Sequence, residues 1–87
     1  MEDISKLQDQ VLGAVSGGVI SQDEALANAQ ARAKLSKEEV DFVKKIEMDY
    51  EHGRRIYEVE FYKDGFEYKF DIDATTGKVL KFKKEWD

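Results

Sequence analysis

Residues 57–73 decide the fold, and they read YEVEFYKDGFEYKFDID. On both sides of Asp64-Gly65 apolar and polar side chains alternate, which is the period of a β-strand with one buried face. Asp-Gly tolerates the positive φ angles of a two-residue type I′ turn, so the segment predicts a β-hairpin. A turn of this length also fixes the register, and it places Lys63 opposite Phe66.

Counting outward from this turn separates an apolar face from a charged face. The predicted apolar pairs are Phe61 with Tyr68, Val59 with Phe70, and Tyr57 with Ile72. A slip of one residue would turn all of these side chains towards water, so the register is strongly determined. On the charged face Glu60 faces Lys69, a favourable cross-strand pair, whereas Glu58 faces Asp71, an unfavourable one.

The same period continues on both sides of the hairpin and predicts four strands, at about 40–50, 55–63, 66–73 and 79–85. The turn at 51–54 sets Met48 opposite Tyr57, and the turn at 74–78 sets Ile72 opposite Leu80. The four strands then form an antiparallel meander with one continuous apolar face. Its predicted members are Phe42, Ile46, Met48, Tyr57, Val59, Phe61, Tyr68, Phe70, Ile72, Leu80 and Phe82.

A helix is predicted before the strands, at about 21–34. Ser21-Gln22-Asp23-Glu24 has the pattern of a capping box, in which the Ser21 hydroxyl and the Glu24 carboxylate each accept a hydrogen bond from the other residue's backbone N–H. Ala25, Ala29 and Ala33 then recur every four residues. This stripe of small side chains predicts a helix that lies close to the sheet and covers its apolar face. The capping-box pattern recurs at Ser36–Glu39, where we expect a short turn.

Residues 1–18 are predicted to contain a separate amphipathic helix. Apolar residues at positions 4, 7, 11 and 15 share one helical face, and Gly17-Gly18 ends the pattern. The segment either docks on a partner or membrane surface or packs on its own domain, and its acidic flanks favour the second interpretation. The predicted fold class is therefore α+β, with N-terminal helices packed on one face of a four-stranded meander. The predicted division is 1–18 for this helix and 19–87 for the main domain.

Composition excludes several functional classes. The 87 residues contain no cysteine and one histidine, which rules out thiolate metal sites, cysteine nucleophiles and a His-pair zinc site within one chain. No window reaches the roughly 18 apolar residues of a membrane span. Residues 1–18 lack the pattern of a signal peptide, so we expect an exported protein of this sequence to carry its leader upstream. Lysines at 78, 81, 83 and 84 are followed by acids at 85 and 87, which argues against nucleic-acid binding.

With the alanine helix, the strand Tyr57–Phe61 and the segment Asp71–Gly77, the chain closely resembles the PepSY domain family. The resemblance covers about residues 19–84. A glycine usually ends the helix of this family, whereas Lys34-Leu35 stands at that place here. The resemblance implies a helix packed on an antiparallel sheet, much as in cystatin-like folds.

Functionally, the resemblance implies a non-catalytic, propeptide-like module of secreted or cell-envelope proteins, lipoproteins among them. The implied partner is a peptidase, chiefly a metallopeptidase, whose activity the module restrains. The alternative is a structural or sensory envelope module that binds a peptide or protein at the edge of the first or fourth strand. The family supplies no catalytic, cofactor or metal residues to transfer, and we predict none. The sequence leaves open the oligomeric state and whether Met1 is the natural start.

Three local features have residue types found in functional sites. Asp71, Asp73 and Thr75 have the alternate spacing of calcium ligands, but Thr76 stands where an EF-hand needs glycine, so a turn is predicted. His52 lies in a predicted turn beside charged residues, which argues against a catalytic role. Trp86 is either a clamp on the edge of the core or an exposed contact residue, and the clamp is favoured.

Overall fold

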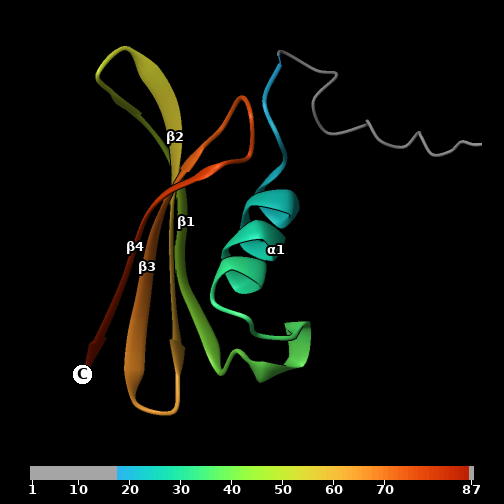
Figure 1. Ribbon diagram of the computed structural model, residues 1–87, viewed down its shortest axis with the longest axis vertical. Coiled ribbons are helices and arrows are strands. Elements are labelled where there is room, and N and C mark those ends of the chain that lie inside the picture. The colour runs from blue at the N-terminus through green and yellow to red at the C-terminus, as the bar shows by residue number, and fades with distance from the viewer. Residues whose placement is uncertain (1–17, 87) are drawn as a thin grey trace, which may run out of the picture.

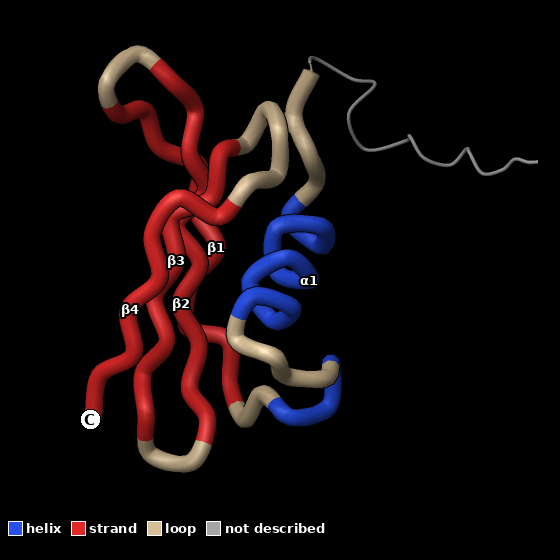
Figure 2. The backbone as a smooth tube through the Cα atoms, in the orientation of Figure 1, coloured by secondary structure: helices blue, strands red, loops and turns tan. Residues whose placement is uncertain are grey.

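The computed structural model describes residues 18–86, in which a four-stranded antiparallel sheet carries one α-helix on one face (Figures 1 and 2). The strand order β1-β2-β3-β4 follows the chain, so the sheet is the predicted meander. The elements are α1 (Gln22–Arg32), the 3₁₀ turn η1 (Lys37–Glu39), β1 (Phe42–Glu51), β2 (Arg54–Lys63), β3 (Phe66–Asp73) and β4 (Val79–Trp86).

The prediction of more than one N-terminal helix is not supported, because residues 18–86 contain a single α-helix. The second capping-box pattern forms only η1, where the Glu39 carboxylate accepts a hydrogen bond from the Ser36 N–H at 2.6 Å. Val40 is already extended, so no helix follows this cap. The amphipathic helix predicted within residues 1–18 lies outside the described residues.

The β2–β3 hairpin has the predicted turn and register. Asp64 and Gly65 have φ angles of 52° and 82°, as a type I′ turn requires. Lys63 pairs with Phe66, and every apolar pair predicted from that turn is present. The face that points towards α1 is called the inner face below, and the opposite face is the outer face.

Aromatic side chains of β2 and β3 form the centre of the core on the inner face. Phe61 is fully buried and Phe70 is 2% exposed. The Phe61 ring centroid lies 5.2 Å from that of Tyr68 and 5.3 Å from that of Phe70. The Phe70 ring in turn stacks on Phe82 of β4 at 4.8 Å, so the packing continues across three strands.

Helix α1 covers this core with its alanine stripe. The predicted capping box is formed, with the Glu24 N–H donating to the Ser21 hydroxyl at 3.1 Å and the Ser21 N–H donating to the Glu24 carboxylate at 3.0 Å. Ala25 and Ala29 are fully buried against the sheet. Lys34, at the place where the family usually has glycine, adopts the left-handed conformation with a φ of 61° and lets the chain leave the helix.

Two hydrogen bonds fasten the helical segment to the sheet. The buried Tyr57 hydroxyl donates to the Ile20 carbonyl at 2.9 Å, just before the helix begins. The Asn28 side-chain amide donates to the Gly77 carbonyl in the β3–β4 turn at 3.0 Å. The approach at Gly77 is close, because a Cβ there would lie 2.9 Å from Asn28 Nδ2. The position of α1 is therefore fixed by specific polar contacts as well as by burial.

A β-bulge in β1 overturns the predicted position of Phe42. The register shifts between Val43 and Lys45, so Val43 faces Phe61 and Phe42 faces Tyr62. Phe42 is 61% exposed and stacks on the Tyr62 ring at 6.2 Å on the outer face. The extra residue, Lys44, breaks the alternation from which the inner face was predicted.

A second bulge overturns the predicted pairing of Leu80. Ile72 pairs with Val79 instead, while Phe70 pairs with Phe82 as predicted. Leu80 is displaced from the ladder and is 39% exposed. Met48 does face Tyr57 as predicted, but it is 43% exposed because α1 packs over β2, β3 and β4. The apolar face is thus narrower than the sequence predicted.

We expect Phe70→Ala to lower the free energy of unfolding by about 3–5 kcal/mol, because it removes a buried ring that three strands share. Thermal or urea denaturation followed by circular dichroism measures the change. Phe42→Ala is the matched control, since that ring is 61% exposed, and it should cost far less. Equal losses in the two variants would contradict the assigned core.

Candidate protein-binding surface

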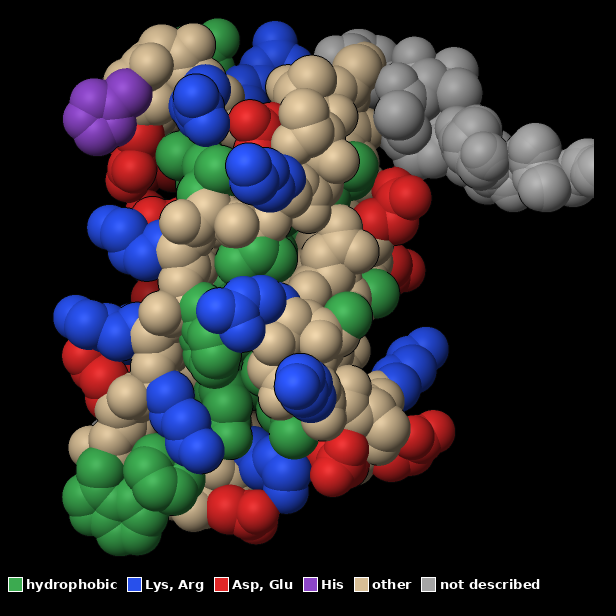
Figure 3. Space-filling model, in the orientation of Figure 1, with side chains coloured by type: hydrophobic (Ala, Val, Ile, Leu, Met, Phe, Trp, Pro, Cys, Tyr) green, Lys and Arg blue, Asp and Glu red, His purple; other side chains and the backbone are tan. Residues whose placement is uncertain are grey.

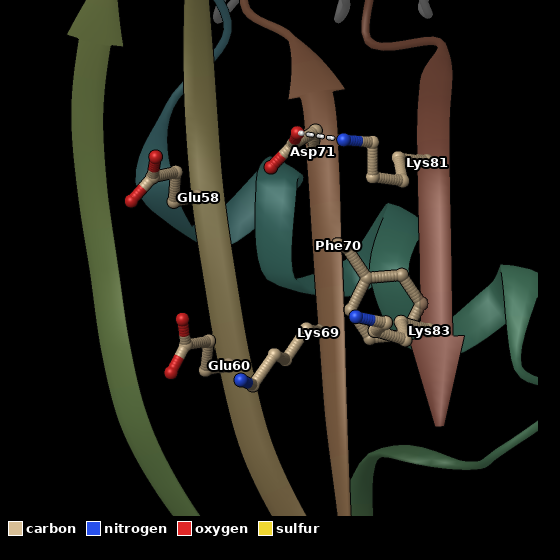
Figure 4. Close-up of a pocket in the computed structure, with 7 residues that line it drawn as sticks. All are labelled: Glu58, Glu60, Lys69, Phe70, Asp71, Lys81 and Lys83. Carbon is tan, nitrogen blue, oxygen red and sulfur yellow. Dashed lines mark ion pairs between the residues drawn. The ribbon is translucent and has the colours of Figure 1, made fainter. Parts of the chain in front are cut away.

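The outer face of the sheet is charged. Figure 4 shows it from the side opposite α1, with acidic side chains on β2 and basic side chains on β4. A shallow hollow of about 220 Å³ lies here, lined by Glu58, Glu60, Lys69, Phe70, Asp71, Lys81 and Lys83. Ligand pockets are usually larger than about 300 Å³ and mostly apolar. The hollow therefore does not have the character of a small-molecule site.

Ion pairs on this face join β1 to the centre of the sheet. Lys45 Nζ lies 2.9 Å from a Glu58 carboxylate oxygen, and this hydrogen bond raises the pKa of Lys45. Lys44, placed by the bulge, donates to Glu67 of β3 at 2.9 Å and lowers the pKa of that buried carboxyl. The two lysines of β1 thus balance acids on β2 and β3.

The lysines of β4 are more exposed than those of β1. Lys81 lies 3.9 Å from the Asp71 carboxylate, and its side chain is 74% exposed. Lys83 lies 3.2 Å from Glu85 of the same strand, and its side chain is 64% exposed. β4 therefore presents positive charge to solvent along one edge of the sheet.

Both outer strands leave one edge without a strand neighbour among residues 18–86. Such an edge carries backbone N–H and C=O groups that can pair with another chain. β1 also exposes large inner-face side chains, with Met48 at 43% and Tyr50 at 66% exposure. Protein interfaces are enriched in aromatic residues and methionine, so these strands are candidate contact surfaces.

Trp86 is the last residue of β4 and lies beside Phe66, the first residue of β3. Its ring packs edge-on against Phe66 at 4.7 Å, yet the residue is 74% exposed. Lys84 Nζ lies 4.4 Å from the centroid of Phe66, and the Arg32 guanidinium lies 4.9 Å from that of Phe82. Figure 3 shows apolar side chains gathered where β4 ends, with Lys and Arg side chains along the same face. Trp86 thus combines a contact to the sheet with a large exposed area.

His52 and the Asp73–Thr75 segment belong to turns in the structure. His52 is an exposed turn residue with a φ of 52°, next to Gly53. One Asp73 carboxylate oxygen accepts hydrogen bonds from the Thr75 and Thr76 N–H groups at 2.8 and 3.1 Å. These bonds, with Arg54 nearby, hold the pKa of Asp73 below its ordinary value.

One cluster of carboxylates was not identified from the sequence. Asp49, Glu51 and Glu58 bring oxygens within 4.8 Å of one another at the partly exposed end of β1. They come from two strands, so their proximity depends on the register of the β1–β2 hairpin. Glu58 already pairs with Lys45, and the cluster chiefly makes this part of the β1 edge acidic.

Comparison with known protein families agrees with this architecture. The model of the PepSY family, described as the peptidase propeptide and YPEB domain, matches residues 19–83. The chain belongs to the PepSY family. Domains of this family are generally non-catalytic modules of propeptide or inhibitor type. No curated protein and no solved structure matches the chain. Within residues 18–86, no helix has the length and apolar character needed to cross a membrane.

The Asp73 turn predicts a pH dependence of stability. Because the folded-state pKa of Asp73 is depressed, its stabilising contribution is present above the unfolded pKa of about 3.9 and is lost as the pH falls through the folded value. We expect Asp73→Asn, whose amide oxygen still accepts hydrogen bonds, to flatten the loss of stability below pH 4. Urea denaturation at a series of pH values measures this slope. Identical slopes in both proteins would contradict the assigned role of Asp73.

Proposed function

We propose that this PepSY domain is a non-catalytic module that binds a secreted or cell-envelope peptidase and restrains its activity. The observation that carries the proposal is the family match over residues 19–83, which spans the helix, the first three strands and most of β4. Peptidase propeptides are among the proteins that give the family its description.

The chemistry of the described residues favours restraint by binding rather than by reaction. Two of the carboxylates have structural roles, since Asp73 closes a turn and Glu67 pairs with Lys44. By contrast, Met48, Tyr50 and Trp86 expose large surfaces at the edges of the sheet. A module of this kind would cover the peptidase cleft and keep substrate out without forming a covalent bond.

An inhibition assay tests this function. The 87-residue chain, added in excess to purified peptidases from the same organism, chiefly metallopeptidases, should slow the cleavage of a fluorogenic peptide. Electrophoresis should show the chain intact at the end of the assay, since an inhibitor that is merely a competing substrate would be degraded. Phe70→Ala serves as a control for the requirement that the domain is folded.

The decisive comparison uses exposed residues of the candidate surface. Trp86→Ala and Tyr50→Ala should leave the melting temperature nearly unchanged, because both side chains are mostly exposed. At least one of them should weaken inhibition if the edges of the sheet contact the peptidase. A broad panel with neither inhibition nor a complex by size-exclusion chromatography would overturn the proposed function.

The free strand edges support a second candidate function. A structural or sensory envelope module would bind an extended peptide or protein segment by adding a strand to β1 or β4. Chemical cross-linking in the native envelope distinguishes the two functions, because it identifies the bound protein. A partner without peptidase activity, cross-linked through β1 or β4, would favour the second function.

A further inference from the structure

We propose that the edge of β4 pairs with the edge of β1 of a second copy of this chain, so that the sheet continues from one molecule into the next. The two edges belong to opposite ends of the same sheet, and each has a single strand neighbour among residues 18–86. They also differ in charge, since β4 carries exposed lysines and β1 carries Glu47, Asp49 and Glu51. This inference stands independently of the proposed peptidase binding.

The meander supplies the required strand direction. Each strand runs antiparallel to its neighbour, so in a sheet of four strands β1 and β4 run in opposite directions. A second copy moved sideways along the sheet, without rotation, therefore places its β1 antiparallel to β4 of the first. Its helix then lies on the same face as the first helix, and the inner and outer faces of the two sheets coincide.

One register gives complementary partners at four of the five facing positions of the paired segment, and the fifth places Lys84 opposite Ile46. If Phe82 faces Met48 of the second copy, two apolar side chains meet on the inner face. Met48 is 43% exposed in the single chain, and Phe82 is partly exposed. Antiparallel counting then fixes the charged neighbours on the outer face. They are Lys81 with Asp49, Lys83 with Glu47, and Glu85 with Lys45. All three pairs join opposite charges, which stabilises neighbouring strands when they lie directly opposite.

Pairing of β4 with itself is less favourable. In a two-fold antiparallel pair, the residue on the axis faces its own copy. An axis at Lys83, Lys84 or Glu85 therefore puts two like charges directly opposite, and an axis at Phe82 puts Lys81 opposite Lys83. Like charges in this position are destabilising. The β4–β1 arrangement avoids these contacts within residues 81–85 and 45–49.

Charged side chains on an edge strand usually prevent association between copies of a protein. That protection requires the two meeting edges to repel, as they do when both carry the same charge. Here the lysines of β4 discourage a second β4 and attract the acidic edge of β1. The lysines of β4 therefore disfavour a β4–β4 contact and favour a β4–β1 contact.

The two β-bulges limit the paired segment. Lys44 interrupts β1 and Leu80 interrupts β4, so regular pairing extends over residues 45–49 of one copy and 81–85 of the other. A contact this short predicts weak, concentration-dependent association. Because the contact joins different surfaces, each added copy leaves a free β1 and a free β4, and the oligomers lengthen with concentration.

Sedimentation velocity of the full 87-residue chain at low salt tests this contact. The unmodified chain should show a sedimentation coefficient that rises with concentration and falls back as salt is added. Two charge-reversed variants, Lys81→Glu/Lys83→Glu and Glu47→Lys/Asp49→Lys, should each weaken association by about tenfold. The matched control is Lys34→Glu/Lys37→Glu, which changes the net charge as much as the β4 variant but lies in the α1–β1 connection. It should associate like the unmodified chain.

Mixing the two charge-reversed variants gives the sharpest result. Each variant alone opposes like charges at the contact, but the mixture again offers opposite charges at both kinds of edge. Association should therefore return in the mixture, and also in one chain that carries all four substitutions. Circular dichroism confirms that every variant is folded. An unmodified chain that stays monomeric up to millimolar concentration would overturn the proposal, and so would variants whose association is unchanged or is not restored by mixing.

Discussion

The two-residue turn at Asp64-Gly65 is the constraint on which the rest of the structure depends. It leaves one register for β2 and β3, and that register puts Phe61 and Phe70 on a single face. α1 can then lie close to the sheet because the side chains facing those rings, Ala25 and Ala29, are small. A chain of this size has no disulfide to add stability, so the packing across β2 and β3 must supply it.

The centre of the fold could be predicted from short-range sequence patterns alone. The type I′ turn, the pairs that it fixes and the Ser21 cap depend on neighbouring residues, and all are present. The bulges at Lys44 and Leu80 were missed because an alternating pattern assumes an unbroken ladder. A signal existed in each case, since Lys44-Lys45 and Val79-Leu80 place two residues of the same character side by side. The candidate surface was predicted only as an edge, because its exposure depends on which strands α1 covers.

The core lies on the two central strands, so of the described strands only the two outer ones offer free backbone groups to a partner. β2 and β3 are enclosed by neighbours, whereas β1 and β4 each keep one free edge within the described residues. Opposite charges and exposed Met48, Tyr50 and Trp86 make these edges chemically distinct from each other. A partner strand and a second copy would use the same backbone groups, so self-association and partner binding should compete.

The central claim is that β2 and β3 form the stable centre of the sheet and that β1 and β4 each have one free edge. Native-state hydrogen exchange, measured by NMR on dilute protein, tests this claim most directly. We predict the slowest exchange for backbone amides of β2 and β3, such as Val59, Phe61, Phe70 and Ile72. Alternate amides of β1 and β4, those that point away from the sheet, should exchange much faster. Uniformly slow exchange across all four strands would contradict the assignment of free edges to β1 and β4.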